Sequence, residues 1–518
     1  MKNAINSVKV ERPNNNAFDL THDVKLSCQM GELVPVVCMD LVPGDRVRIS
    51  MEALVRMMPL IAPVLHRLDV SFHAFFVPNR LVWPNWETWI TNGGDNPNQA
   101  TLPAHPYFMY NAGGTGGAQP YSKLMDYMGL PNPTLGITPT VAEKVSAIPF
   151  AALQLIYDEY YRDENLIDRI DPVLSDGDNS AFDELFDLRN RAWEADYFTK
   201  ALPFAQKGQP VDLPLGEVTL KDVTPTTGSL PLFKNMDDHT AANTGALLNT
   251  GNVQGINVSG FNDSMVYDPV GTLEVTPTTI NDLRLAFRLQ EWLEKNARGG
   301  TRYSELIRSH FGVTPLDARL QRPEYITGTK TPIQISEVLN TSGEGDLPQG
   351  NMAGHGISFT SGKYGKYFAT EHGYLICLMS VMPKTSYFQG IPKHFLKYTD
   401  PTELAWPTFA HLGEQEVLNK EIFAFQDTDG NNTFGYQSRY FEYKNLPSRC
   451  CTQMRTTLDY WHLSRKFATP PALNSTFIHS NPTTRIFAVE GEDDHLVVQV
   501  LNKIMAIRPL PVYGTPTF

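Results

Sequence analysis

Apolar runs of strand length stand near both ends of this chain, with a long and more varied stretch between them. Residues 67–77 read RLDVSFHAFFV, where apolar and polar side chains alternate, so this segment is predicted to be a half-buried strand. Residues 374–382 form a continuous apolar run, and the β-rich runs 485–490 and 495–501 flank the acidic turn GEDD. If one core unites these strands, the two chain ends meet in space and the middle consists largely of excursions from that core.

The composition favours the same fold class. With 518 residues and 42% hydrophobic content, the chain can bury a sizeable core. Its 37 glycines and 38 prolines spread turns along the whole sequence, which suits short strands joined by long connections better than a bundle of long helices. No repeat or linker divides the chain, so residues 1–518 are predicted to form a single elaborated domain.

Helices are expected within the excursions. Residues 281–298 carry an apolar stripe opposite a charged face, Thr279 and Asp282 can cap its start, and Gly299 and Gly300 can end it. Weaker helical patterns are found in the segments 52–61, 150–161 and 181–197.

Residues 217–278 differ from the rest of the sequence. This stretch contains 10 Thr, 6 Asn and 6 Gly, and seven acidic residues against two lysines. Its apolar residues are mostly single, and its three aromatic residues are Phe233, Phe261 and Tyr267. We expect a surface excursion that could bury these rings only by gathering with other copies.

The sequence contains no recognisable catalytic or metal-binding motif. HExxH, GxSxG and GxGxxG are absent, and the 13 histidines are scattered singly. Asp427, Asp429 and Asn431 resemble the start of a calcium loop, but the glycine and the closing glutamate of such a loop are missing. The five cysteines are predicted to be reduced, small apolar residues. We therefore expect a protein that is not an enzyme and that holds neither cofactor nor metal.

No segment of the sequence resembles a signal peptide or a membrane span, so a soluble protein made in the cytoplasm is expected. The net charge of −13 matters for any role with nucleic acid. A protein that wraps nucleic acid by itself normally carries a strongly basic face. If this chain packages DNA, another molecule must supply most of the positive charge.

One locally basic segment, residues 436–466, interleaves cations with aromatic rings, a combination that suits single-stranded nucleic acid. The alternative is that these residues line a strand and a subunit interface, where arginine and aromatic residues are also enriched. Another basic segment, 284–322, is interpreted as a solvated or ion-paired helical face. The candidate phosphate contacts are Arg439, Lys444, Arg449 and Arg455.

Ten blocks of sequence, in the same order along nearly the whole chain, resemble the major capsid proteins of the Microviridae, and most closely the gokushovirus-like members. Several blocks are long and idiosyncratic, among them FDLTHDVKLSCQMGELVPV (18–36). The other blocks are 41–45, 75–83, 201–216, 283–313, 317–326, 371–378, 413–423, 434–449 and 508–514.

The resemblance implies an eight-stranded antiparallel viral jelly roll with large loop and α-helical insertions. It also implies a T=1 icosahedral shell around a circular single-stranded DNA genome, found in the virion and assembled in the host bacterial cytoplasm. Residues 217–278 would be a variable insertion that forms a protrusion at the threefold axis. The implied partners are further copies of the chain, a small basic DNA-binding protein, a scaffolding protein, a pilot protein and a host surface receptor.

Two other classes of protein are open on the residues alone. A carbohydrate-binding or carbohydrate-active jelly-roll protein would need a cleft with paired carboxylates or an aromatic platform, and it would form at most a small oligomer. A cellular single-strand-binding protein is opposed by the acidic net charge.

Overall fold

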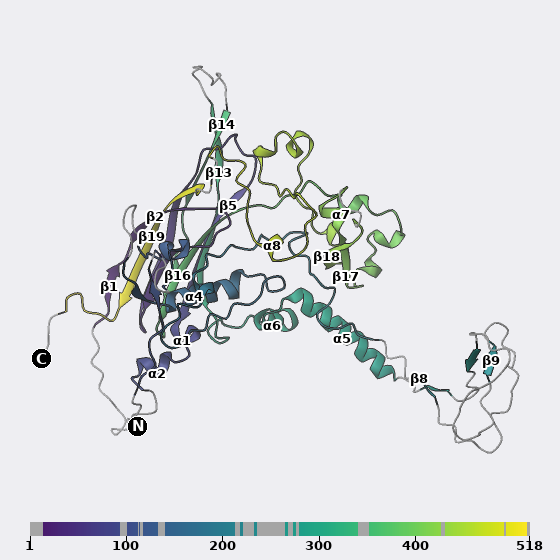
Figure 1. Cartoon of the computed structure of the whole chain (residues 1–518), viewed down its shortest axis with the longest axis horizontal. Coiled ribbons are helices and arrows are strands. Elements are labelled where there is room, and N and C mark those ends of the chain that lie inside the picture. Colours follow the sequence, from purple (N-terminus) through teal and green to yellow (C-terminus); the bar gives the residue numbers. More distant parts are fainter. Residues whose placement is uncertain are drawn as a thin grey trace, which may run out of the picture. The chain divides into compact units, whose positions relative to one another are not determined.

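The computed structural model describes residues 14–93, 101–111, 113, 118–132, 140–212, 279–339, 352–425, 430–489, 491 and 494–514, with four short strands between 218 and 275. The chain forms two compact units, one of residues 1–205 with 296–518 and one of residues 206–295. The first unit is mainly β, and its sheets are antiparallel (Figure 1).

The larger sheet has seven strands and joins the two ends of the chain. The strands β2, β19, β4 and β14 lie side by side in that order, with β1 also on β19, β15 also on β4, and β13 on β14. Leu496 of β19 pairs with Cys28 of β2, which confirms that the two ends meet. The strands are β1 Asn16–Asp19, β2 His22–Cys28, β4 Arg46–Met57, β13 Gln334–Leu339, β14 Met352–Thr360, β15 Gly365–Phe368 and β19 Leu496–Arg508.

The smaller sheet has four strands in the order β12, β5, β16, β3. They are β3 Val34–Leu41, β5 Leu68–Pro78, β12 Glu324–Pro332 and β16 Gly373–Pro383. The strands predicted at 67–77, 374–382 and 495–501 are therefore confirmed, as β5, β16 and β19.

The two sheets face each other across one apolar core. Alternate residues of β4 and β19, such as Val55 and Val500, meet alternate residues of β5 and β16, such as Phe72 and Leu375, and all four are fully buried. This is the arrangement of a β-sandwich, in which side chains from two inner faces interdigitate.

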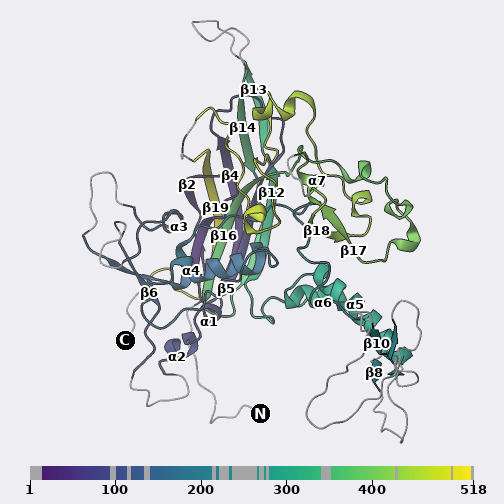
Figure 2. The ribbon, with the colours of Figure 1, turned by 45° about the vertical axis from the view of Figure 1, so that its right-hand side comes forward.

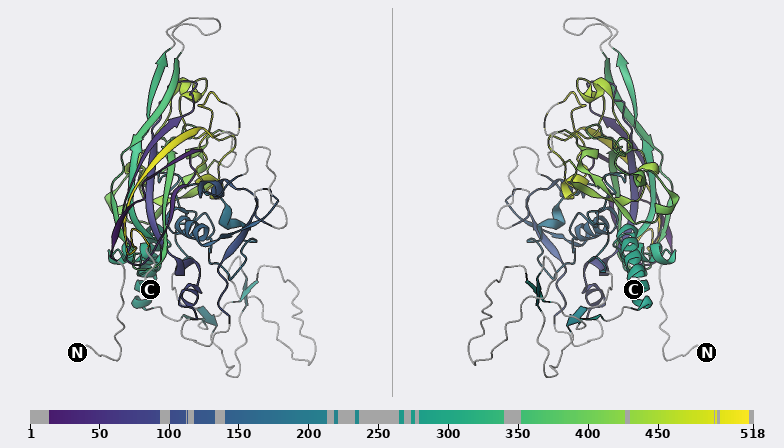
Figure 3. Two further views of the ribbon diagram at one scale, coloured as in Figure 1. Left: turned by 90° about the vertical axis from the view of Figure 1, so that its left-hand side faces the viewer. Right: turned by 90° about the vertical axis from the view of Figure 1, so that its right-hand side faces the viewer.

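The outer face of the smaller sheet is covered as well. Phe75 and Ile376 point away from the sandwich and pack with Phe150 and Leu153 of α4, which lies across β16 and β5 (Figure 2). The insertion after β5 thus forms a layer beside the strands (Figure 3). Its elements are α1 Asn79–Val82, α2 Trp86–Ile90, β6 Tyr107–Tyr110, α3 Lys123–Tyr127, β7 Glu143–Ser146, α4 Ile148–Ile156 and a π-turn Tyr157–Tyr161.

This cover makes the prediction of a half-buried strand at 67–77 wrong, because β5 is buried on both faces. Its polar side chains are accommodated by partners. Ser71 hydrogen-bonds the Ser380 hydroxyl at 2.8 Å, and the buried Asp69 forms an ion pair with Lys330 at 3.2 Å. A buried carboxylate is tolerated only when it is paired in this way.

A separate lobe follows β16 and has its own small core. The hairpin of β17 Glu414–Leu418 and β18 Thr433–Ser438 packs with Tyr197, Phe198 and Phe477. Two short helices complete it, α7 Asn419–Ile422 and α8 Ser475–Ile478. Single-turn 3₁₀ helices at 393–395, 401–403, 407–409, 441–443, 452–455 and 459–461 carry the remaining chain of this lobe, and a further one spans Asp183–Phe186.

The predicted helix at 281–298 is confirmed as α5, Ile280–Gly299, and α6 follows it at Tyr303–Phe311. The Asp282 carboxylate accepts hydrogen bonds from the Thr279 amide at 3.1 Å and from its hydroxyl at 2.7 Å, so the predicted cap is present. Gly300 adopts a φ of 106°, a conformation that glycine allows at little cost where the helix ends.

Other predicted elements differ from the structure. The helix predicted at 150–161 is confirmed by α4 and its π-turn, but the segment 52–61 belongs mainly to strand β4. Segment 181–197 contains only one 3₁₀ turn, and the described part of the predicted strand 485–490, residues 485–489, is not a strand. All five cysteines are free, as predicted, but Cys38 and Cys451 are exposed and not buried. Asp427 and Asp429 lie outside the described residues.

Candidate nucleic-acid and assembly surfaces

The segment 436–466 leaves strand β18 and runs over the surface of the lobe in short turns. Tyr440 has a φ of 60°, and this left-handed residue turns the chain sharply after Ser438. Its hydroxyl group donates to the Thr402 carbonyl at 2.9 Å, which anchors the turn. The three 3₁₀ helices of the segment leave many of its side chains on the surface.

The four predicted phosphate contacts lie in two kinds of environment. Arg439 is half-buried, donates to the Thr402 carbonyl at 3.0 Å and stacks over the Tyr440 ring at 4.9 Å. Lys444, Arg449 and Arg455 are exposed, and Arg455 donates through Nε to the Cys450 carbonyl at 2.9 Å. Three of the four can therefore reach a ligand directly, and Arg439 also holds the loop. Their role in nucleic-acid binding stays a prediction.

Two further cations of this segment act within the fold. The Arg465 guanidinium lies 4.0 Å from the centre of the Phe477 ring and 5.0 Å from that of Trp193. Lys466 forms an ion pair with Asp459 at 2.8 Å. The mixture of cations and rings in the sequence is thus partly the packing of the lobe itself, and the alternative interpretation as a subunit interface stays a prediction.

The predicted surface residues of the insertion are only partly described. Phe261 lies outside the described residues. Phe233 and Tyr267 stand directly opposite each other in a two-stranded antiparallel pairing of β9 Phe233–Asn235 with β10 Met265–Tyr267. A second pairing joins β8 Val218–Leu220 to β11 Leu273–Val275.

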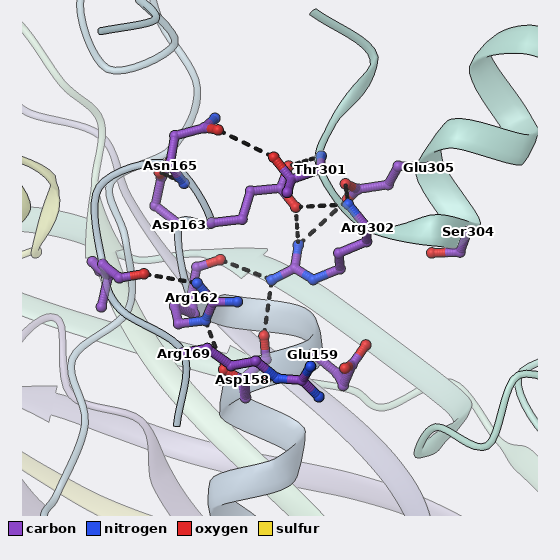
Figure 4. A network of polar contacts seen from close by, with 12 residues as sticks. Asp158, Glu159, Arg162, Asp163, Asn165, Arg169, Thr301, Arg302, Ser304 and Glu305 are labelled. Atoms are coloured by element: carbon purple, nitrogen blue, oxygen red, sulfur yellow. Dashed lines mark hydrogen bonds and ion pairs between the residues drawn. The ribbon is translucent and has the colours of Figure 1, made fainter. Parts of the chain in front are cut away.

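A polar network that the sequence did not indicate joins the π-turn to the start of α6 (Figure 4). The Arg302 guanidinium donates to the carbonyls of Asp158 and Arg162 at 2.8 and 3.0 Å. It therefore places a cation at the C-terminal end of the α4 helix, where a positive charge is favourable. The Glu164 carboxylate accepts from the Thr301 amide at 2.8 Å and from the Arg302 amide at 3.2 Å, at the N-terminus of α6.

The network lines a cavity of about 550 Å³ in which each arginine has a carboxylate partner. Arg162 pairs with Asp158 at 2.6 Å, and Arg322 lies 3.4 Å from Asp317. Arg302 and Arg322 of the basic segment 284–322 are thus ion-paired, which agrees with its interpretation as a solvated or ion-paired face. Asp158 and Glu159 bind different arginines, so they do not act together as an acid and a base. Paired charges of this kind brace the fold and provide no reactive group.

Within the part of the chain that the structure describes, no helix is long and apolar enough to cross a membrane. The same part of the chain exposes large apolar side chains, including Phe311, Leu316 and Tyr398, each more than two-thirds exposed. Extensive exposed apolar surface marks sites of protein association. A β-sandwich whose insertions are braced by paired charges, with large apolar side chains left on its surface, fits a structural subunit that associates with other chains.

Comparison with known proteins supports that class. A profile of the family described as "Capsid protein (F protein)" matches residues 4–518. The chain is 36% identical over 520 residues to "Capsid protein VP1" of Bdellovibrio phage phiMH2K, covering 96% of this chain and 94% of that one. It is 33% identical to the capsid protein VP1 of Chlamydia phage 1, over 100% and 98% of the two chains.

The corresponding protein of Spiroplasma virus 4 is 30% identical, over 96% of this chain and 94% of its own. The chain belongs to the F capsid protein family of the Microviridae, as the sequence blocks predicted. It is a capsid protein of a bacteriophage virion, it forms a shell of identical chains, and it is not an enzyme.

The polar network generates a prediction on pH. Burial, repulsion by Glu164 and a hydrogen bond to that carboxylate raise the pKa of Glu305 above its ordinary 4.5. The folded chain therefore holds this proton more tightly than the unfolded chain. Its contribution to stability is fully present below pH 4.5 and is lost as the pH rises through the folded value. Glu305→Gln should remove that loss.

We expect Glu305→Gln to raise the free energy of unfolding at pH 7 by less than about 1 kcal/mol, since the side chain is 37% exposed and partly screened. At pH 4 the variant and the parent should be equal. Urea titrations at both pH values measure this. Glu291→Gln, at a 65% exposed position, is the matched control and should leave the pH dependence unchanged. Equal pH dependence of parent and Glu305→Gln would contradict the prediction.

Proposed function

We propose that this chain is an eight-stranded viral jelly roll that assembles into a T=1 icosahedral shell around a circular single-stranded DNA genome. The observation that supports the roll is the strand order. The eight strands of the roll are β2, β3, β4, β5, β12, β14, β16 and β19, numbered one to eight along the chain. One sheet then has the strand order first, eighth, third, sixth, and the other has the order second, seventh, fourth, fifth. That antiparallel order is the one produced by rolling up a pair of Greek keys.

The insertions explain the length of the chain. The connection from β5 to β12 carries α1 to α6 and the whole of the second unit, and the connection from β16 to β19 carries the lobe. On this proposal residues 1–518 form a single elaborated capsid domain, and residues 217–278 form a surface insertion at the threefold axis. A carbohydrate-binding role is not favoured, because the relatives are capsid proteins.

The net charge of −13 bears on which partners the chain would need. A shell of such chains would need counter-charges for the genome, which a small basic DNA-binding protein would supply. A scaffolding protein, a pilot protein and a host surface receptor complete the proposed partners, and assembly would take place in the cytoplasm of the host bacterium.

The direct test is particle formation. The full chain, produced with its scaffolding partner, should sediment as a large assembly and appear in negative stain as uniform round shells. Each subunit of a closed shell uses several surface patches, so single substitutions of exposed charges should leave assembly intact. A chain that stays monomeric under all packaging conditions would contradict the shell.

The predicted phosphate contacts can be tested in assembled particles. The quadruple variant Arg439→Ala, Lys444→Ala, Arg449→Ala, Arg455→Ala should lower the DNA content of shells or the salt sensitivity of DNA retention. Removing one cation that binds a phosphate should lower the logarithmic salt slope by about 0.7. Because Arg439 also holds its loop, the triple variant that keeps it controls for misfolding. Unchanged packaging in both variants would assign these residues to a subunit interface.

The insertion is tested by deletion. Replacing residues 225–270 with a short glycine linker should give shells that form normally but no longer adsorb to host cells, because an exposed loop on a rigid scaffold is suited to recognition. Failure to assemble would instead indicate that the insertion steadies the trimer. Normal infectivity of the deletion variant would exclude both roles.

A further inference from the structure

The seven-stranded sheet has one face in the sandwich core and one face that turns away from it. Along β4, Val47, Ile49 and Val55 are buried in the core, whereas Arg46, Arg48 and Arg56 alternate with such residues and are exposed. The insertion covers β5 and β16 on the outer face of the smaller sheet, but the outer face of the larger sheet keeps most of its charged side chains accessible. We call it the cationic sheet face.

The strand register gathers further cations on this face. Arg48 stands opposite Lys366 of β15 on one side and Met505 of β19 on the other. Residues that stand directly opposite each other share one face of a sheet. The residues of this face are Lys25, Arg46, Arg48, Arg56, Lys366 and Lys503 as cations, and Asp19, Asp23 and Glu52 as carboxylates.

Aromatic rings lie among these cations. The Arg48 guanidinium sits 4.0 Å from the centre of the Tyr364 ring, and that of Arg46 sits 5.6 Å from the Phe368 ring. Phe359, on β14 opposite Leu54 of β4, is 68% exposed. The rings are therefore open to a stacking partner, and two of them are held by neighbouring guanidinium groups.

The charges of the face are largely uncompensated. Lys503 forms an ion pair with Glu52 at 2.6 Å. Among the residues that the structure describes, no ion pair is made by the other five cations. By contrast, Arg162, Arg302 and Arg322 in the polar network are all paired. In a chain with a net charge of −13, this face attracts an anionic partner and repels a basic one.

We propose that the cationic sheet face binds the single-stranded genome on the inside of the shell, an inference that rests on the proposed enclosure of single-stranded DNA. Arg46, Arg48 and Lys366 would contact backbone phosphates, and bases would stack on Phe359 and Phe368. Stacking and phosphate contacts require no particular base, so the binding is independent of sequence. A small basic protein would not fit this face, because like charges would oppose each other.

The test uses the full-length chain and a fluorescein-labelled oligothymidylate, with binding followed by fluorescence anisotropy at several salt concentrations. The triple variant Arg46→Gln, Arg48→Gln, Lys366→Gln should lower the logarithmic salt slope by about 2, from about 0.7 for each of three phosphate contacts. The matched control is Lys200→Gln, Arg288→Gln, Arg319→Gln. It removes the same charge at exposed positions elsewhere and should leave the slope unchanged.

A second variant separates stacking from charge. Phe359→Ala with Phe368→Ala should weaken binding at least about fivefold at fixed salt and leave the salt slope unchanged. The proposal would be overturned if the cationic triple variant kept the salt slope of the parent chain, or if the control variant lost as much of that slope. It would also be overturned if the triple variant bound DNA normally but formed no shells, because the face would then contact protein, such as an acidic partner.

Shell formation is scored separately by negative stain. A parent chain that binds the oligonucleotide through this face but forms no shells would contradict the proposed function and leave the binding face supported. Circular dichroism and urea titration of each variant establish that it is folded before its slope is compared.

Discussion

The face-to-face packing of two antiparallel sheets is the interaction on which the rest of this protein depends. Its core brings together strands from positions 34–57, 68–78, 373–383 and 496–508. The sandwich is therefore complete only when strands from both ends of the chain have paired. Long-range strand pairing pays the entropy of loop closure before it gains any contact energy. The insertion after β5 packs against the outer face of β5 and β16, so its place in the structure depends on this core.

The two sheets differ in how many of their faces are buried, and this difference determines where the strands can carry exposed charges. The β5–β16 sheet is buried on both faces, because α4 and its neighbours complete a second core there. Its polar residues must then find partners, as Ser71 and Asp69 do. The β4–β19 sheet has only one buried face, so its strands can carry charges on the other without any cost of burial.

The sequence contained enough information to predict the strands with clear apolar patterns, the helix at 280–299 and its cap, because these depend on local spacing. It could not distinguish helix from strand at 52–57, where Leu54 and Met58 add apolar residues to the alternation of Ala53, Val55 and Met57. Nor could it indicate the polar network, since Arg302 finds its partners at Asp158 and Glu164, far away in the sequence. Likewise, burial of the polar side of β5 depends on a layer supplied by a later insertion.

Net charge alone says little about whether such a chain can hold nucleic acid, because it does not separate cations that brace the fold from cations that remain available. Arg298, Arg302 and Arg322 are engaged by carboxylates, and Arg465 is surrounded by rings. These four cations belong to the basic segments 284–322 and 436–466, but they are engaged within the fold. Besides the exposed Lys444, Arg449 and Arg455, available cations lie where a strand alternates between a core and an open face, which becomes visible only once the register of β4, β15 and β19 is known. An acidic shell protein can therefore keep a face on which cations outnumber carboxylates, provided that most of its acidic residues are placed elsewhere.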